Sequence, residues 1–275
     1  MTAPVAVVTG ASRGAGRGIA LALGDLGATV YLTGRSASVA EVADEVTARG
    51  GRGIGVVCDH ADPAAVAALF TRVGEEQEGG LDVLVNNAIA LPSGLGDDQP
   101  FWERPLEHQR MFDVGLRSTY AASWHAAPLL VEARGLLVNT SSFGGGCYMH
   151  GPAYGAAKAG VDRLVHDMAI DLAPYDVTAV SLWMGILRTE RTLAALEADP
   201  DRYGDLAART ESVEFPGRVV AALWRHPERT RWSGQTVVAA ELAVELGVVD
   251  VDGAQPPSHR PMLGGPPAVN PAIVR

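Results

Sequence analysis

The order of apolar segments along the chain constrains the fold more than any other feature. Seven short apolar runs, bounded by Gly, Asn or Asp, alternate with alanine-rich stretches that carry apolar residues at helical spacing. Short, continuous apolar runs of this kind are typical of buried strands. We predict strands at residues 5–8, 29–33, 53–58, 83–85, 136–139, 178–182 and 236–239.

The stretches between these runs are long enough to cross from one strand to the next. Their periodicity predicts helices within residues 18–26, 38–49, 61–76, 102–132, 153–173 and 211–224. Repeated strand–helix–strand units build a parallel sheet with right-handed crossovers and helices on both faces. We therefore predict one α/β domain over residues 1–253, a doubly wound (Rossmann) fold with a mainly parallel seven-stranded sheet.

Two segments fall outside this alternation. Residues 188–210 are charged and alanine-rich, and we interpret them as an insertion near the substrate, either a mobile lid or a pair of surface helices. Residues 254–275 are rich in Pro and Gly, which excludes regular helix. We expect this tail to be disordered or to extend across a neighbouring subunit.

The charge balance narrows the possible partners. A formal net charge of -10 repels phosphate backbones and anionic lipids, so we expect a small-molecule partner and neither nucleic acid nor a membrane. Cys58 and Cys147 are too few for a disulfide framework and indicate a reducing, cytoplasmic location. His60 beside Asp59 has no third ligand at useful spacing, so we expect no metal site.

A glycine-rich turn follows the first predicted strand and precedes a helix. Glycines at such a turn let the backbone approach a pyrophosphate, and the helix N-terminus supplies unpaired N–H groups. The pattern predicts a dinucleotide site, with candidate residues Gly10, Ser12, Arg13, Gly14, Ala15 and Gly16.

The end of the second predicted strand indicates which dinucleotide binds. An NAD site normally carries an acidic residue there, which holds the adenosine ribose. This chain has Arg35 instead, and Arg13 lies in the glycine turn. Two guanidinium groups offer bidentate donors to a 2'-phosphate, so we predict NADP(H) as the cofactor.

A tyrosine and a lysine four residues apart stand near the start of the fifth predicted helix. The spacing places Tyr154 and Lys158 on one helix face. A free phenol titrates at about pH 10. A nearby ammonium and an oxidised nicotinamide are expected to lower its pKa by about two pH units or more. The strand at 136–139 runs into Ser141 and Ser142, of which we choose Ser142 to hold the substrate oxygen, with Ser141 as the alternative.

The combination of these motifs resembles the short-chain dehydrogenase/reductase family over about residues 4–250. The resemblance rests, in chain order, on TGASRGAG, the Asn86-Asn87-Ala88 stretch, the two serines, YGAAK and Gly185-Ile186-Leu187-Arg188-Thr189. Further stretches at 101–103, 113–117 and 250–253 resemble a narrower subgroup, dehydrogenase/reductase SDR family member 1.

The resemblance implies roles for individual residues. Ser142 would orient the substrate oxygen, Tyr154 would exchange the proton and Lys158 would hold the nicotinamide ribose. The remaining cofactor contacts would come from Asp59 and His60 near the adenine, Asn87 and Ala88 near the adenosine ribose, and Gly185, Leu187 and Thr189 near the carboxamide. Members of the family are usually tetramers or dimers built on helices that match 102–132 and 153–173.

Three positions depart from the family pattern. Gly115 stands where the family often has an asparagine, whose backbone carbonyl binds a water of the proton relay. A glycine keeps that carbonyl, so the relay water is an open question. Ile89 replaces the usual glycine, and Met184 replaces the proline before Gly185, which changes the shape expected for the nicotinamide pocket.

We therefore predict an oxidoreductase, a carbonyl reductase or alcohol dehydrogenase that moves a hydride between NADP(H) and a ketone, aldehyde or secondary alcohol. Apolar and aromatic residues around Tyr148, Met149, Trp183 and Met184 favour a bulky hydrophobic substrate. The alternative is an NADP(H)-binding sensor or subunit without turnover.

Overall fold

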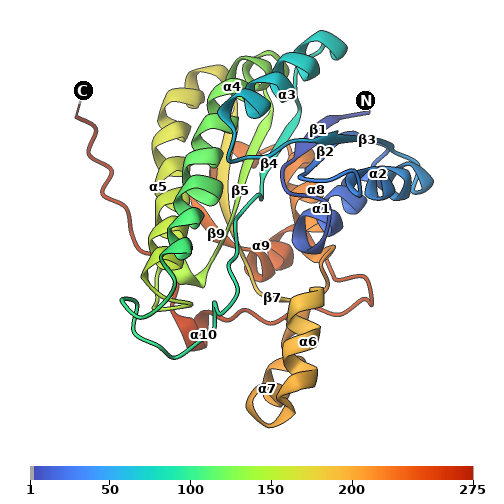
Figure 1. The fold of residues 1–275 in the computed structure, drawn as a ribbon. Helices are drawn as coiled ribbons and strands as arrows, with labels where there is room; N and C mark the ends of the chain where they lie inside the picture. The colour runs from blue at the N-terminus through green and yellow to red at the C-terminus, as the bar shows by residue number, and fades with distance from the viewer. Residues whose placement is uncertain (1–2, 275) are drawn as a thin grey trace.

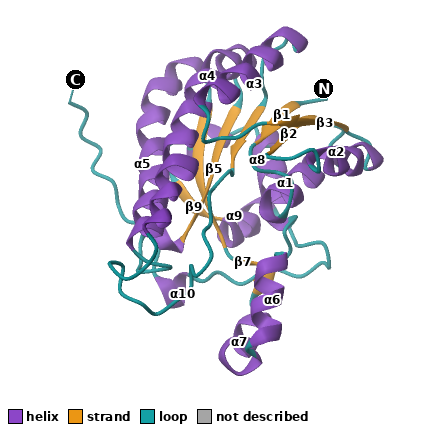
Figure 2. Ribbon diagram, viewed as in Figure 1, coloured by secondary structure: helices purple, strands orange, loops and turns teal. Residues whose placement is uncertain are grey.

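Seven parallel strands lie side by side in one sheet (Figures 1 and 2). The computed structural model describes residues 3–274, without the side chains of residues 202, 203 and 205. The strand order is β3-β2-β1-β4-β5-β6-β9. The predicted sheet is confirmed, with strands β1 (Val5–Val8), β2 (Thr29–Gly34), β3 (Arg52–Val57), β4 (Val83–Asn86), β5 (Leu136–Ser142), β6 (Thr178–Met184) and β9 (Thr236–Val238).

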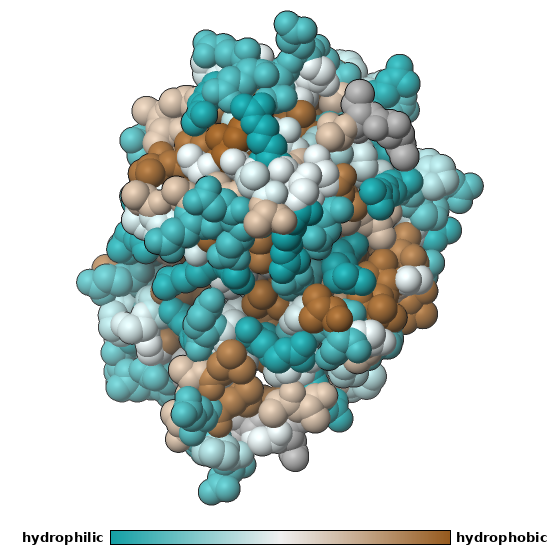
Figure 3. Space-filling model, turned by 90° about the vertical axis from the view of Figure 1, so that its right-hand side faces the viewer, coloured by the Kyte–Doolittle hydropathy of each residue, from teal (hydrophilic) through white to brown (hydrophobic). Residues whose placement is uncertain are grey.

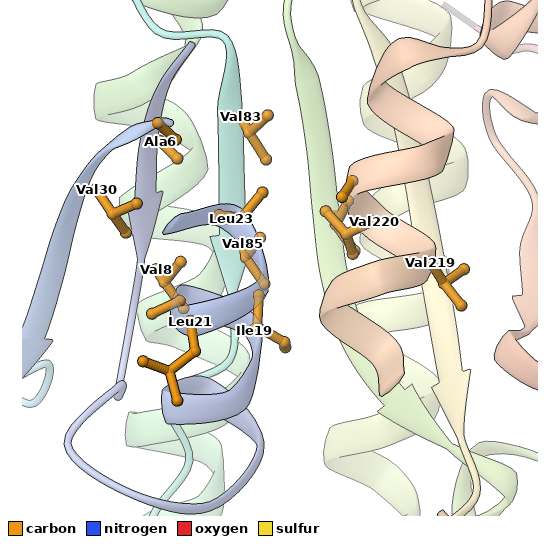
Figure 4. Packing of buried hydrophobic residues seen from close by; sticks show 14 of the residues in the cluster. Ala6, Val8, Ile19, Leu21, Leu23, Val30, Val83, Val85, Val219 and Val220 are labelled. Atoms are coloured by element: carbon orange, nitrogen blue, oxygen red, sulfur yellow. The ribbon is translucent and has the colours of Figure 1, made fainter. Parts of the chain in front are cut away.

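Helices cover both faces of the sheet, as predicted. One face packs against α1 (Gly14–Gly24), α2 (Val39–Ala48), α8 (Phe215–Arg225) and α9 (Ala239–Leu246). The other packs against α3 (Pro63–Glu76), α4 (Ser118–Ala133) and α5 (Pro152–Leu172). Neighbouring strand residues point to opposite faces, so Val8 joins the first layer and Val7 the second. In Figure 4 Val8 and Val85 gather with Ile19 of α1 in the first layer.

The chain changes direction across the sheet at β1. It runs outward through β2 and β3 and then returns to β4, which pairs with β1 on the other side. The connections after β1 and β4 therefore lead to helices on opposite faces of the sheet, α1 and α4. In doubly wound folds a crevice at this point is where ligands bind.

The segment predicted as one helix over 102–132 is not one helix. The continuous helix α4 begins only at Ser118, after the short turns η1 (Leu106–Gln109) and η2 (Phe112–Arg117). Val114 and Gly115 leave helical geometry, and Gly115 has a φ of 147°, which an L side chain rarely adopts. The prediction was wrong here because apolar periodicity continues through a backbone kink that only the fold specifies.

The region after β6 also differs from the prediction. Strands β7 (Ile186–Leu187) and β8 (Thr210–Glu211) form a second, two-stranded parallel sheet, so the helix expected from 211 begins at Phe215. Between them the charged segment forms two helices, α6 (Glu190–Ala198) and α7 (Pro200–Ala207), which project below the sheet in Figure 1. Of the two interpretations of residues 188–210, the structure agrees with a pair of helices.

The Pro/Gly-rich tail packs partly against the rest of the chain. A single helical turn, α10 (Arg260–Leu263), has Pro261 at its start, where the missing N–H group costs nothing. The expectation that prolines exclude helix is therefore wrong for this turn. Arg260 pairs with Glu241 of α9 at 2.6 Å, and His259 is buried.

Polar side chains separate the apolar patches on the face drawn in Figure 3. Within residues 3–274, no helix is both long and apolar enough to cross a bilayer. The remaining short helical turns are η3 (Phe143–Gly145), η4 (Ala173–Tyr175) and η5 (Arg229–Trp232).

Candidate active site

The glycine turn after β1 lies in close backbone contact with the loop after β4. A Cβ on Gly10 would stand 2.8 Å from the Cα of Ala88, and a Cβ on Gly16 would stand 2.3 Å from the Gly10 carbonyl oxygen. No side chain caps the N-terminus of α1. The turn thus leaves backbone surface and helix N–H groups open to an anion, as a pyrophosphate cradle requires.

Asn87 and Ala88 brace this turn. The Asn87 amide nitrogen Nδ2 donates to the carbonyl oxygens of Thr9 and Gly10, both at 3.0 Å. The backbone N–H groups of Asn87 and Ala88 donate to Thr9 Oγ1 at 2.9 and 3.0 Å. These two residues, predicted near a ribose, are placed by the structure against the glycine turn.

His60 supports the same turn from beneath. Its Nε2 lies 2.8 Å from Thr33 Oγ1, which accepts a hydrogen bond from Gly10 N at 2.9 Å. Burial lowers the pKa of His60 to about 4, so the imidazole is neutral near pH 7. Asp59, its neighbour, accepts a hydrogen bond from Ala61 N at 2.9 Å.

The two arginines predicted to select the cofactor stand on adjoining turns. A Cβ on Gly34, the last residue of β2, would lie 3.1 Å from Ser12 Cβ, so the glycine turn contacts the end of β2. Arg13 and Arg35 extend this contact region and are both exposed. Across the described part of the chain neither forms an ion pair with a carboxylate. Both guanidinium groups are available to a phosphate.

The predicted catalytic residues meet at the end of β5. Ser142 Oγ lies 2.9 Å from the Tyr154 hydroxyl and accepts a hydrogen bond from Gly144 N at 3.2 Å. Ser141 points the other way, is fully buried and lies 3.4 Å from the Lys158 carbonyl oxygen. Strand alternation thus brings Ser142, and not Ser141, to the phenol.

Lys158 lies within the protein beneath the tyrosine. Its Nζ donates to the Thr140 carbonyl oxygen at 3.0 Å and is 5.8 Å from the centre of the Tyr154 ring. Burial lowers the pKa of Lys158 to about 8, although the carboxylate of Asp162 opposes this shift. Burial raises the pKa of Tyr154, and the Ser142 hydrogen bond offsets only part of that rise. This direction is opposite to the lowering predicted from the sequence, because burial is the largest influence on the phenol.

The loop after β6 reaches back to the glycine turn. Thr189 caps α6 by accepting a hydrogen bond from Thr192 N at 3.2 Å. A Cβ on Gly14 would lie 3.6 Å from Thr189 Cγ2, so this loop and the glycine turn are in contact range. Gly185 and Leu187 lie in the same loop, and Leu187 is buried. Residues far apart in the chain thus lie in contact range at this edge of the sheet.

The family model for short chain dehydrogenases matches residues 4–199. The chain belongs to this family. It is 41% identical over 265 residues to Dehydrogenase/reductase SDR family member 1 of Mus musculus, which covers 92% of this chain and 85% of that protein. The human protein of that name is also 41% identical, over 268 residues, with the same coverage of 92% and 85%. The resemblance to the narrower subgroup is confirmed.

Solved structures of the family share the fold. A 3-oxoacyl-[acyl-carrier protein] reductase from Brucella melitensis superimposes with a TM-score of 0.75 at 29% identity, covering 86% of this chain and 89% of that one. Another such Brucella reductase, solved with bound NAD, has a TM-score of 0.72 at 30% identity, covering 86% and 88%. The chain is therefore an oxidoreductase of the short-chain family and has the Rossmann fold with which this family binds nicotinamide cofactors.

In this dehydrogenase/reductase the kink at Gly115 borders a small cavity beside Lys158. The Gly115 carbonyl oxygen accepts a hydrogen bond from Thr119 Oγ1 at 2.6 Å. The cavity has a volume of about 10 Å³ and is lined by Gly115, Thr119, Thr140 and Lys158, among others. This volume is close to the least that holds one water molecule. Thr119 was not among the predicted site residues.

Asp162 is a second residue that the sequence-based prediction missed. It lies one helical turn beyond Lys158 and accepts hydrogen bonds from Ser181 Oγ and from Trp183 Nε1, the latter at 2.9 Å. Burial raises the pKa of its carboxyl. Its spacing of four residues from Lys158 is the sequence signal that could have found it.

The substrate side of the site is built by loops. The imidazole of His150 stands edge-on to the Tyr154 ring at 5.1 Å, and the Arg104 guanidinium donates to the His150 carbonyl oxygen at 3.0 Å. Met149 packs near Tyr154, and Tyr148 is 78% exposed. Trp183 is fully buried against Phe143 and is a core residue.

No three His, Cys, Asp or Glu side chains cluster closely enough to bind a metal ion in the described part of the chain.

Proposed function

We propose that the protein interconverts a carbonyl compound and an alcohol with NADP(H) as the hydride carrier. The observation that carries the proposal is the contact between Ser142 Oγ and the Tyr154 hydroxyl at 2.9 Å, above a buried Lys158. Three groups at one point can orient a substrate oxygen and exchange its proton. Membership of an oxidoreductase family supports this chemistry.

The residues divide the work in the direction of reduction. When bound, NADP(H) supplies the hydride. Ser142 donates a hydrogen bond to the substrate oxygen as negative charge develops on it, and Tyr154 donates the proton that makes the alcohol. Because burial raises the pKa of Tyr154, the phenol holds its proton at neutral pH and is ready to donate it. In the reverse direction the same groups remove the proton.

Lys158 serves the proton exchange from within the protein. Its ammonium favours the phenolate that remains after proton transfer. We propose that a water molecule occupies the cavity beside Lys158 and Gly115 and returns a proton to the site. The size of the cavity and the position of Gly115 on its lining support this relay. Thr119 would hold the Gly115 carbonyl in position.

NADP(H), and not NAD(H), is the proposed cofactor. The close glycine turn and the uncapped helix α1 fit a pyrophosphate. The exposed Arg13 and Arg35, with no carboxylate at the end of β2, fit a 2'-phosphate.

The substrate and the assembly are proposed from the apolar residues around Tyr154 and on the surface of α4. Met149, Leu95 and Ile89 pack around Tyr154, which favours a bulky hydrophobic ketone, aldehyde or secondary alcohol. Exposed Tyr120 and Trp124 on α4 favour a homo-oligomer, a dimer or tetramer, in which α4 and α5 pack against their copies. We also propose a cytoplasmic location, and we expect no nucleic-acid or membrane partner.

Replacement of Tyr154 by Phe tests the function. Turnover of a responsive ketone, followed by NADPH absorbance, is expected to fall between about 10²- and 10⁴-fold, because the proton donor is lost. NADPH affinity is expected to stay the same. Tyr175→Phe is the matched control, since Tyr175 is exposed on η4.

Two outcomes would contradict the proposal. Unchanged turnover in Tyr154→Phe would remove the tyrosine from the chemistry. NADPH binding without turnover of any compound in a broad ketone panel would favour a cofactor-binding sensor.

A further inference from the structure

A buried carboxyl group lies beside the loop after β6, apart from the catalytic residues. Glu211 ends β8 and is 1% exposed. Its Oε1 accepts a hydrogen bond from Gly185 N at 3.0 Å, and its backbone carbonyl accepts one from Arg188 N at 2.9 Å. One residue therefore holds both ends of the stretch 185–188, which we call the nicotinamide loop.

The backbone pairing around this loop is short. Strands β7 and β8 contribute two residues each, with Ile186 opposite Thr210 and Leu187 opposite Glu211. A two-stranded ladder of this length is marginal by itself. A Cβ on Gly185 would lie 2.7 Å from Glu211 Oε2 and 3.3 Å from the His259 ring. The carboxyl and the imidazole thus pack directly on the loop and fix its position.

Charges of both signs lie around Glu211, and the positive charge of Arg188 opposes the effect of burial on its pKa. Arg188 turns to Asp250 and Asp252, at 3.4 and 3.9 Å. Asp250 is itself buried, accepts a hydrogen bond from Ser212 N at 2.8 Å and adds negative charge near Glu211. Among residues 3–274 no ion pair involves Glu211 itself.

The tail segment packed on Glu211 adds no positive charge. Burial lowers the pKa of His259, a contact with the Arg209 backbone opposes this shift and the charge of Arg209 adds to it, so the imidazole is neutral near pH 7. The surroundings of Glu211 therefore favour a neutral carboxyl group.

We propose that Glu211 is a positioning residue, whose carboxyl group holds the nicotinamide loop in the conformation that binds NADP(H). The inference rests on the proposed function, because it assigns the loop to the cofactor. Glu211 acts through the backbone of Gly185 and has no part in proton transfer at the substrate.

The stability of the closed nicotinamide loop is expected to depend on pH. Burial raises the pKa of Glu211 from 4.5 to about 8. In an opened loop the carboxyl meets water and regains its ordinary pKa. The closed loop therefore binds the proton more tightly than the opened loop. The free energy that this proton contributes to the closed loop is complete below about pH 4.5, falls as the pH rises toward 8 and does not change above that.

Hydrogen exchange of the free protein tests this without cofactor or activity. The protection factor of the peptide 184–189, corrected for intrinsic exchange, is expected to fall at least about tenfold between pH 5.5 and 8.5. Glu211→Gln, whose amide imitates the protonated carboxyl, is expected to show protection that does not vary with pH. Glu211→Ala is expected to show low protection at every pH, and Glu197→Gln on exposed α6 is expected to follow the unmodified protein.

NADPH affinity provides the second readout. The dissociation constant from fluorescence titration is expected to rise from pH 6 to 8 more steeply in the unmodified protein than in Glu211→Gln. Equal pH dependence in the two proteins, or constant protection of 184–189 in the unmodified protein, would overturn the proposal. The unmodified protein decides the exchange result even if a variant fails to fold. The expected exchange result without NADPH binding would contradict the proposed function and leave Glu211 as a holder of the loop only.

Discussion

The glycine turn and the surroundings of Tyr154 form two halves of one site, and they are held by different contacts. Gly10 and Gly16, near the start of the chain, are packed closely against backbone. A Cβ on Gly10 would lie 2.8 Å from Ala88 Cα, and a Cβ on Gly16 would lie 2.3 Å from the Gly10 carbonyl oxygen. The surroundings of Tyr154 are fixed by polar side chains from later segments, including Arg104 and Asp162. A site held by backbone tolerates no added atom, whereas one held by side chains is sensitive to charge and pH.

The largest effect is expected from a methyl group in the glycine turn. In Gly16→Ala the new Cβ would meet the Gly10 carbonyl oxygen at 2.3 Å and Asn87 Nδ2 at 2.5 Å, so the turn must move. A displacement of about 1 Å costs on the order of 100-fold in affinity or rate. NADPH titration measures the loss. Gly79→Ala is the control, because a Cβ on Gly79 would have no atom within 4 Å. Equal NADPH affinity in the two variants would show that close backbone packing does not fix the glycine turn.

Arg35→Ala is expected to act on cofactor choice rather than on the turn. Loss of a charge-assisted hydrogen bond to the 2'-phosphate is expected to reduce the preference for NADPH over NADH about tenfold or more. The ratio of kcat/KM for the two cofactors measures it. Arg225→Ala, at an exposed position on α8, is the control. An unchanged ratio would show that Arg35 does not select the cofactor.

Arg104→Ala sharpens the comparison from the substrate side. Arg104 donates to the carbonyl oxygens of Gln99, His150 and Asp97, and so ties the loop at 97–104 to the loop before Tyr154. Its loss is expected to lower kcat/KM for the ketone about tenfold through misplacement of the substrate, with NADPH affinity unchanged. Exposed Arg110→Ala is the control. A matching loss of NADPH affinity would mean that the two halves are not separate.

Asp162→Asn is expected to shift a pH profile. The Asp162 carboxylate raises the pKa of Lys158, which burial lowers to about 8. Without this carboxylate the pKa of Lys158 falls further. Because turnover needs the ammonium, the alkaline limb of the pH profile is expected to move to a pH lower by about one pH unit. Asp167→Asn, on the exposed side of α5, is the control. An alkaline limb that stays in place would exclude Asp162 from tuning the lysine.

The fold was predictable to the extent that its signals are local. Each of the seven strands is a short apolar run, and burial on both faces makes such runs continuous. Strands β7 and β8 have two residues each and leave no periodic signal, so Glu211 was assigned to a helix. The kink at Gly115 lies before α4 and does not interrupt the apolar pattern that runs through it.

The site followed the same rule. Tyr154 and Lys158 were found by their spacing along a helix, and Ser142 by its place at a strand end. Asp162, Thr119 and Glu211 were missed because their partners lie on other elements or across a kink.

By itself the sequence determined the parallel sheet, the glycine turn after β1 and the tyrosine–lysine pair, since apolar periodicity and residue spacing set them locally. Only the tertiary structure decided that Ser142, and not Ser141, meets Tyr154, because strand alternation and the packing of α5 choose the side chain. It also decided the pKa of Tyr154, Lys158 and Glu211. Burial and neighbouring charge set those values, and both depend on segments that are distant in the chain.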